Sequence, residues 1–431
     1  MANKLSRINR VAIAGQTGSP VWDQVETYSG IAYQDLEMTS DSSMEASQPR
    51  IETTGQRGDG ELPLAAEGNR DASISLNFYL RGLDLTGGAG NAVSASTATP
   101  QYDTILQQIT GGAVSNNTGD VVAVGATTRW LIFVSNAANF SVGNFAGWVN
   151  AAGEIEAMPI VATDNVANTI TLAGDGAATG GFSAIPAVGN VIYASRTYSM
   201  SQQAGERLPL AIHAALADGN ADRFFLGCFG SLSFSDAGGL LAGAYTAQAH
   251  DWKATSELLA PAPPAFGVFA APTLGPVSTR GTRAIISSVD SWGVAAGVHT
   301  PSAVTIPTVI SGELDVAVDM QARTAQTGTN GRQGFVAVDN GCAMPIRLYH
   351  DGATATFLGF GDASLLSLQE GANLAVARQY GTAAGNIVVT EIPNYQGDAV
   401  IGEEAGLATI DLTGRGYRPS NGTATIRIHL L

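Results

Sequence analysis

Hydrophobic residues occupy every second position in several short segments of the chain. Between Ala72 and Leu80, Ile74, Leu76 and Phe78 alternate with polar residues. Because successive side chains of a β-strand point to opposite faces, this period predicts half-buried strands whose second face meets water or a partner. Gly, Asn, Asp and Pro separate the segments, as expected for turns. The same alternation marks Ser231–Ser235, Glu313–Met320 and Thr423–Leu430.

A few segments follow another period. Trp130–Val134 is a continuous apolar run, which favours a strand buried on both faces. Helical spacing is best in Tyr102–Gly111, where hydrophobic residues fall three and four positions apart and the final glycine supplies a C-terminal stop. A second, weaker helix is predicted over Leu210–Leu216, ended by Asp218–Gly219.

Three polar or proline-rich stretches divide this all-β chain with its one or two short helices. Thr39–Arg70 has no strong strand pattern, and connectors of that length are usually functional or disordered. Thr86–Pro100 has linker composition, and Pro261–Ala265 indicates a stiff boundary. Similar spacing of strands and turns on both sides of that boundary leaves a duplication open. We expect a first domain in two parts (1–114 and 196–260), a small β insertion (115–195) and a second β domain (261–431).

The composition excludes disorder and argues against electrostatic binding of nucleic acid. Hydrophobic residues make up 45% of the 431 residues and charged residues only 13%, whereas disordered chains have little hydrophobicity and much charge. The net charge is −16, and Lys4 and Lys253 are the only lysines. Phosphate binding needs clustered basic residues, which are missing. So weakly charged a surface is better suited to contact with other subunits than to a solitary protein.

No segment carries the pattern of a catalytic, cofactor or metal site. The sequence has no nucleophile elbow and no phosphate-binding glycine loop, and its five histidines are dispersed. Cys228 and Cys342 are far apart, and two buried free thiols are favoured over one disulfide. We therefore expect neither an enzyme nor a cofactor. The N-terminal segment does not have the pattern of a signal peptide, and no apolar run is long enough for a membrane helix.

Two regions resemble a known family. Ile387–Gly397 carries an Ile-Pro pair and leads into Ala405–Gly414 and then a last strand, Ala424–Leu430. Phe225–Gly239 is a glycine-bearing strand with a Ser/Leu alternation and a turn. These segments, with the polar loop before Ala72–Leu80 and the short helix, resemble the major tail tube proteins of siphophages, which have long non-contractile tails.

The resemblance implies a structural virion protein made in the host bacterial cytoplasm. Such a subunit is a β-sandwich whose sheets close, in the oligomer, into an inner barrel around a channel. The partners implied are other copies of the chain in stacked trimeric or hexameric rings, and the terminator, tape-measure and distal tail proteins. DNA would pass through without specific binding, and no membrane is implied. The alternatives are a capsid decoration or minor tail protein, or a β-rich adhesin or carbohydrate-binding module.

The N-terminal arm and the Thr39–Arg70 loop are the hypothetical contacts between successive rings. Both are polar, and basic groups of the arm could meet acidic groups on a neighbour. The candidate residues are Lys4, Arg7, Arg10, Asp41, Arg50, Arg57, Asp59 and Glu61.

Overall fold

The fold was analysed on a computed structural model, in which the chain is mostly β-strand, as predicted. The structure describes residues 8–16, 33–48, 50–51, 66–67, 70–83, 99–111, 113–125, 127–174, 180–200, 209–216, 222–254, 274–295, 298–324, 332–351, 358, 373–383, 385–418 and 424–431.

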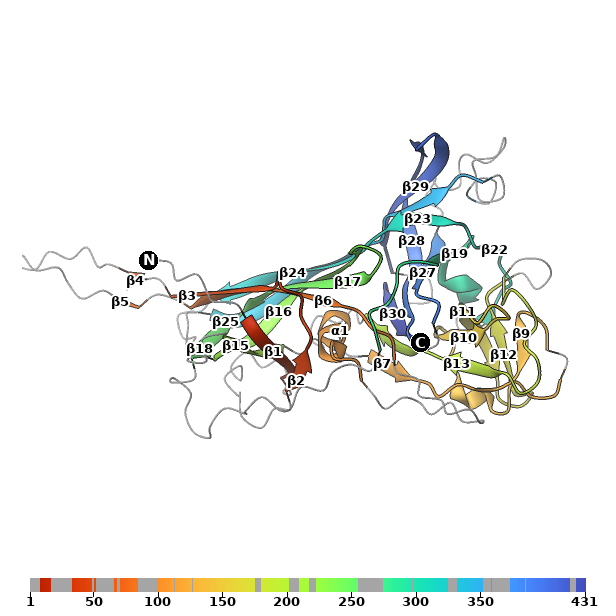
Figure 1. The fold of residues 1–431 in the computed structure, drawn as a ribbon, viewed down its shortest axis with the longest axis horizontal. Helices are drawn as coiled ribbons and strands as arrows, with labels where there is room; N and C mark the ends of the chain where they lie inside the picture. Colours follow the sequence, from red (N-terminus) through yellow and green to blue (C-terminus); the bar gives the residue numbers. More distant parts are fainter. Residues whose placement is uncertain are drawn as a thin grey trace, which may run out of the picture.

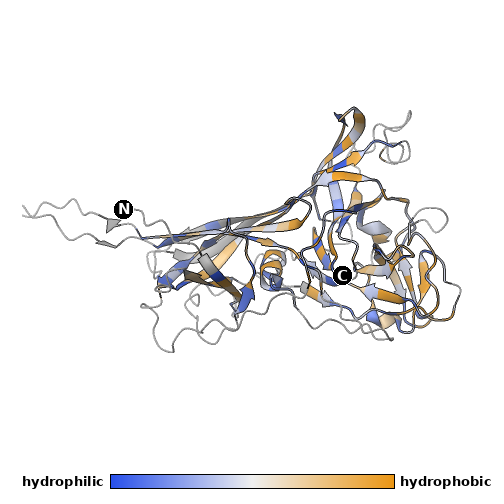
Figure 2. Ribbon diagram, viewed as in Figure 1, coloured by the Kyte–Doolittle hydropathy of each residue, from blue (hydrophilic) through white to orange (hydrophobic). Residues whose placement is uncertain are grey.

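Eight antiparallel strands from both halves of the chain form one long sheet, part of which curves into a half-barrel (Figure 1). Along these strands, hydrophobic and hydrophilic residues alternate (Figure 2). The alternation predicted for Ala72–Leu80 is confirmed, because Ile74, Leu76 and Phe78 are buried while Ser73 is exposed. The spatial order is β3 (Ser43–Ser47), β6 (Asp71–Tyr79), β17 (Leu241–Ala249), β16 (Arg223–Asp236), β24 (Leu314–Thr324), β25 (Arg332–Ala343), β29 (Leu407–Gly416) and β28 (Val388–Glu404).

A second layer of strands completes the sandwich over one face of this sheet. The hydrophobic core between the layers is continuous through both halves of the chain. In the first half the second layer contains β1 (Ile8–Gly15), β2 (Gln34–Leu36), β15 (Leu210–Leu216) and β18 (Asp251–Ala254). In the second half it contains β19 (Arg283–Ser287), β22 (Val304–Thr305), β27 (Leu374–Tyr380) and β30 (Arg427–Leu430).

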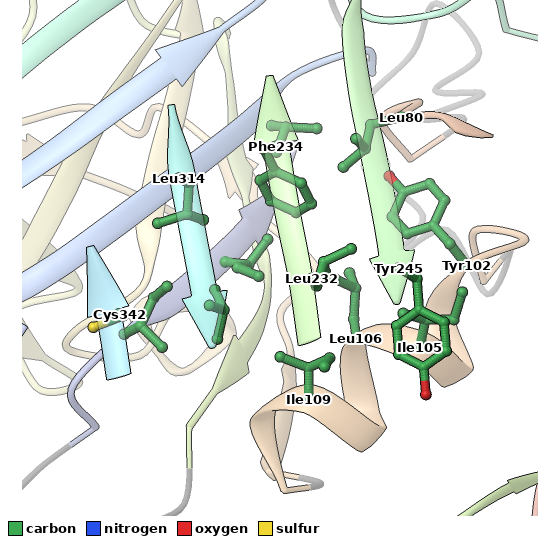
Figure 3. Close-up of a cluster of buried hydrophobic side chains, with 14 of the residues drawn as sticks. Leu80, Tyr102, Ile105, Leu106, Ile109, Leu232, Phe234, Tyr245, Leu314 and Cys342 are labelled. Carbon is green, nitrogen blue, oxygen red and sulfur yellow. The ribbon is translucent and has the colours of Figure 1, made fainter. Parts of the chain in front are cut away.

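The helix predicted over Tyr102–Gly111 is present as α1 (Asp103–Thr110). It ends at Gly111, whose φ of 86° is a left-handed conformation that glycine adopts without strain. Its apolar residues Ile105, Leu106 and Ile109 are buried against the sheet, near Leu232 and Tyr245 (Figure 3). The helix therefore covers the core face of the long sheet.

The second predicted helix is wrong, because Leu210–Leu216 is strand β15. It lies between β1 and β16 and forms antiparallel ladders with both. Alanine and leucine favour a helix locally, but two neighbouring strands supply hydrogen bonds to both edges of this segment, and tertiary pairing overrides propensity.

The two halves repeat the same order of strands. In each half, the strand before the long β16 or β28 pairs with it through a register shift. Leu210 and Ile212 face Cys228 and Phe225 in the first half, and Leu374 and Val376 face Tyr395 and Ile392 in the second. The succession β1, β2, β3, β6, β15, β16, β17, β18 thus corresponds to β19, β22, β24, β25, β27, β28, β29, β30. This correspondence favours the duplication that the sequence left open.

A separate six-stranded sheet spans residues 120–194. Its core is shared with β27, β28 and the C-terminal Leu431, so it packs against the second half of the sandwich. The prediction that Trp130–Val134 is buried on both faces is wrong. The strand there, Leu131–Phe133, lies at the edge of the sheet, and Ile132 and Val134 are buried on one face while Leu131 and Phe133 on the other are only half-buried. The order is β8 (Asp120–Val121), β13 (Val191–Ala194), β10 (Phe145–Val149), β11 (Ile155–Asp164), β12 (Thr169–Leu172) and β9 (Leu131–Phe133).

Two further expectations need correction. Thr39–Arg70 is not strandless, since it contains β3 and the two-residue strands β4 (Arg50–Ile51) and β5 (Ala66–Glu67), which lie beyond β3 at the far left of Figure 1. Thr423–Leu430 is not a half-buried strand, since β30 is buried at all four residues between β14 (Arg196–Ser199) and β28.

The remaining short elements connect these layers. The strand β7 (Ala113–Asn116) pairs with β14, and β23 (Val309–Gly312) and β26 (Ile346–Tyr349) extend the second half of the long sheet beside β29. Other short elements are β20 (Val294–Ala295), β21 (Val298–His299) and the 3-10 turns η1 (Ala137–Asn139) and η4 (Asp290–Gly293).

Corresponding glycines in the two halves yield a test of the repeat. A Cβ on Gly230 would lie 2.1 Å from the Thr246 carbonyl oxygen, and one on Gly397 would lie 2.2 Å from that of Thr413. We expect Gly230→Ala and Gly397→Ala each to lower the free energy of unfolding by about 1–3 kcal/mol, because the neighbouring backbone must move. Chemical denaturation measures the change. With Ala244→Ser on the same sheet as a control near neutrality, a neutral result for either glycine would contradict this account.

Candidate functional site

The face of the long sheet opposite the core carries exposed and half-buried residues on its described strands, and we call it the polar face. Its residues on β3, β6, β16, β17 and β24 are exposed or half-buried, and they are mostly small and polar. The ladders set them side by side: Ser75 pairs with both Ser43 and Thr246, and Ser233 with Asp315. This part of the polar face comprises Ser43, Glu45, Ser47, Asp71, Ser73, Ser75, Asn77, Tyr79, Phe229, Ser231, Ser233, Ser235, Ala242, Ala244, Thr246, Gln248, Asp315 and Ala317.

The charge of this part is purely acidic. Glu45, Asp71 and Asp315 are its ionisable carboxylates, and no lysine or arginine occurs among its residues. Carboxylates near a surface repel polyanions over roughly a Debye length, about 8 Å at physiological salt. Such a face does not attract nucleic acid.

The second half of the polar face has arginines, and one of them, Arg347, is paired with two acids. The Arg347 guanidinium, on β26, donates to the two oxygens of Asp411 at 2.6 and 2.9 Å and to Glu404 at 3.2 Å. Asp398 and Arg415 also belong to this side of β28 and β29. Among the described side chains of this half, Asp398, Glu404 and Asp411 thus face two arginines, Arg347 and Arg415.

The predicted ring-contact residues are only partly described, and those with described side chains contact their own subunit. Arg10 forms an ion pair with Asp35, which joins β1 to β2. Asp41 accepts hydrogen bonds from Thr39 and, at 3.1 Å, from the Asn77 amide, so it stabilises the turn before β3. Arg50 is placed by its backbone in β4. Lys4, Arg7, Arg57, Asp59 and Glu61 lie outside the described residues.

The polar face itself was not among the predicted site residues. The alternation in Ser231–Ser235 and Ala72–Leu80 indicated a second face on each strand. What could not be inferred is that β6, β17, β16 and β24 adjoin, because their order depends on pairings between residues far apart in sequence.

A buried chain of polar residues offers the one arrangement, within the described ranges, that resembles a catalytic relay. His429 lies 2.8 Å from Glu391 through one ring nitrogen and 2.8 Å from the Thr197 hydroxyl through the other. Arg427 and Trp292 also donate to Glu391, at 3.0 and 2.8 Å. Glu391 and His429 are fully buried, so no substrate can reach them, and the network holds β30 to β28 and β14.

The buried network sets the ionisation of its members. Burial alone would raise the pKa of Glu391, but Arg427 and His429 hold it below the ordinary value. Burial lowers the pKa of His429, despite its hydrogen bond to Glu391. The folded protein thus keeps a carboxylate beside a neutral imidazole.

Other chemistry-bearing groups are structural where they are described. Cys228 and Cys342 are free and buried, as predicted, and burial raises the pKa of the Cys342 thiol to about 11. His213 stacks on Phe224 and contacts Asp222 at 3.0 Å. Over the described ranges, no three His, Cys, Asp or Glu residues gather as a metal site, and no helix is long and apolar enough to span a membrane.

Comparisons with known proteins do not assign the chain to a family. No family model matches the chain, and it has no match among curated proteins.

The buried histidine predicts a loss of stability in mild acid. Below about pH 6.5 the unfolded chain protonates His429, whereas the folded state resists, so the unfolded state binds more protons and stability falls as the pH falls. One such group changes the free energy of unfolding by up to about 1.4 kcal/mol per pH unit. Thermal unfolding of wild type and His429→Gln between pH 7.5 and 5.5 measures this. The variant, which retains His213, should show a shallower decline; equal slopes would refute the assignment.

Proposed function

We propose that this chain is a structural subunit of a phage tail tube, in which copies form stacked rings around a channel for the genome. The observation that carries the proposal is the long sheet with one face in a hydrophobic core and the other small, polar and acidic. A sheet that closes between copies would turn this second face into the wall of a channel. The sequence resemblance supports the same assembly.

The acidity of the polar face supports a conduit more than a binding surface. DNA must slide through a tube without adsorbing, and a polar face with scattered carboxylates, on which Arg347 is paired with Asp411 and Glu404, suits that requirement. Serines and alanines of β16 and β17 make up much of this wall. Its aromatic residues Phe229 and Tyr79 lie beside opposite ends of β17, so they do not form a stacked row for bases. We propose no catalytic role, since the buried polar network is out of reach of substrates.

The repeat within the chain favours three copies per ring. Each chain supplies two halves with the same strand order, so three chains would place six halves around the channel. The other partners that we propose are the terminator, tape-measure and distal tail proteins at the ends of the tube. The place of action would be the virion.

A capsid decoration or minor tail protein is the alternative, and an adhesin or carbohydrate-binding module is a weaker one. Neither accounts for the long sheet, whose two end strands have no further partner among the described strands. A sugar-binding module would also need exposed aromatic platforms, whereas among the described tryptophans Trp148 and Trp292 are buried and Trp130 and Trp252 are half-buried.

Assembly of the purified chain tests the proposal. We expect hollow rods or rings in electron micrographs and a native ring mass of three 44.1 kDa chains. A ring mass of six chains would still agree with a tail tube, but it would exclude three copies per ring. A stable monomer at high concentration would overturn the proposed function.

Charge reversal on the polar face tests its place in the channel. We expect Asp315→Lys with Asp398→Lys to leave ring assembly intact but to slow DNA ejection from particles several-fold, because each substitution repeats in every subunit along the tube. The control is Val166→Lys, which adds a positive charge at a residue 96% exposed on the small sheet. Ejection at the wild-type rate from assembled double variants would show that the polar face does not line the channel.

A further inference from the structure

The contact between the two halves of the chain provides a template for a contact between copies. Strand β24 of the second half pairs antiparallel with the edge of β16 in the first. The register is Leu232 with Val316, Ser233 with Asp315, and Phe234 with Leu314. This pairing is what makes one eight-stranded sheet out of two four-stranded sets.

The strand β28 is the counterpart of β16, and its corresponding edge is vacant among the described strands. Cys228 of β16 and Tyr395 of β28 are equivalent, because each faces the residue beside the register shift, Leu210 or Leu374. Counted from these two residues, the segment Leu232–Phe234 corresponds to Ala399–Ile401. On its open side, β28 pairs with β27 only as far as Tyr395, and no described strand continues along that edge.

Two apolar side chains at this edge are exposed. Val400 is 58% and Ile401 52% exposed, although both lie in a regular strand. Together with Leu407 across the turn, they form the apolar part of the β28–β29 hairpin, which projects at the top of Figures 1 and 2. Unpaired, apolar strand edges of this kind are templates for another strand.

At the other end of the sheet, β3 is the counterpart of β24. Glu45 of β3 pairs with Ser73 of β6, and Asp315 of β24 pairs with Ala343 of β25. Ser73 pairs in turn with Gln248 of β17, and Ala343 with Arg415 of β29, which are corresponding residues of the two halves. Strands β3 and β24 therefore each carry an acidic residue, Glu45 or Asp315, at the same place on the polar face. Among the described strands only β6 pairs with β3, so its outer edge is vacant as well.

We propose that β28 of one copy pairs antiparallel with β3 of a second copy, in the register Ala399 with Ala46, Val400 with Glu45, and Ile401 with Met44. This contact rests on the proposed assembly into rings. It repeats between copies the geometry that β16 and β24 have within one. It places Ile401 beside the buried Met44 on the core side and leaves Glu45 on the polar face.

The contact is head-to-tail, because each copy has one vacant edge of each kind. The same surface cannot pair with itself in this register, so addition continues until the sheet closes on its first copy. Closure removes both vacant edges and covers Val400 and Ile401 with one strand.

Paired cysteines test this register in the assembled protein. We expect Glu45→Cys with Val400→Cys to form disulfides between copies on mild oxidation, so that most chains migrate as covalent dimers and larger species without reductant. Cys228 and Cys342 are buried and should not interfere. Ser233→Cys with Asp315→Cys is the positive control, because the same geometry should give a disulfide within one chain. Glu45→Cys with Ile401→Cys is the negative control, since these side chains would point to opposite faces.

The outcomes separate this contact from the proposed function. Rings or rods that form normally but yield no specific disulfide between the cysteines introduced at Glu45 and Val400 would overturn the register and leave the tube intact. Absence of any oligomer would overturn both. An independent variant, Val400→Lys, should remain a folded monomer with wild-type circular dichroism while its ring population falls; unchanged rings would also refute the contact.

Discussion

The backbone ladder between β16 and β24 is the interaction on which the rest of the architecture depends. Each half of the chain could form a sandwich with a four-stranded sheet, and each would then expose two strand edges. Pairing β16 with β24 satisfies one edge from each half and aligns the two sets into a single surface. Because backbone N–H and C=O groups are obligatory partners, the same requirement reappears at the two ends of the long sheet.

The two faces of that sheet place opposite demands on its residues. Toward the core, α1 and the second layer need large side chains such as Phe78, Phe234 and Tyr245, which fill the space between layers. Away from the core, the described residues are mostly small and polar, such as Ser75, Ser233 and Thr246. The low content of charge follows from this division, since one face is dry and the other is mostly hydroxyl and methyl groups.

Local patterns predicted the strands more reliably than their arrangement. Alternation placed β6, the end of β16 and the start of β24 correctly, and the spacing before Gly111 located α1. The same approach failed at Leu210–Leu216, where pairing with two strands outweighs helix propensity, and at Trp130–Val134, where an edge position leaves side chains exposed. The polar face was inaccessible to it and the repeat was left open, because both depend on the order of strands that lie far apart in the sequence. Nor did any motif announce that Glu391 and His429 would be buried together.

The small sheet of residues 120–194 lies in the chain between β6 and β15 of the first half. The corresponding connection of the second half, which ends at β27, is much shorter and has no counterpart of that length. Two otherwise equivalent units therefore differ on the outside while they match on the polar face. Around a closed assembly, the inner wall would approach six-fold symmetry, but the outer surface would alternate between bulky and slender positions. Anything that docks on the exterior would then meet a strictly three-fold object, so matching partners would be expected to bind in threes even where the channel looks hexagonal.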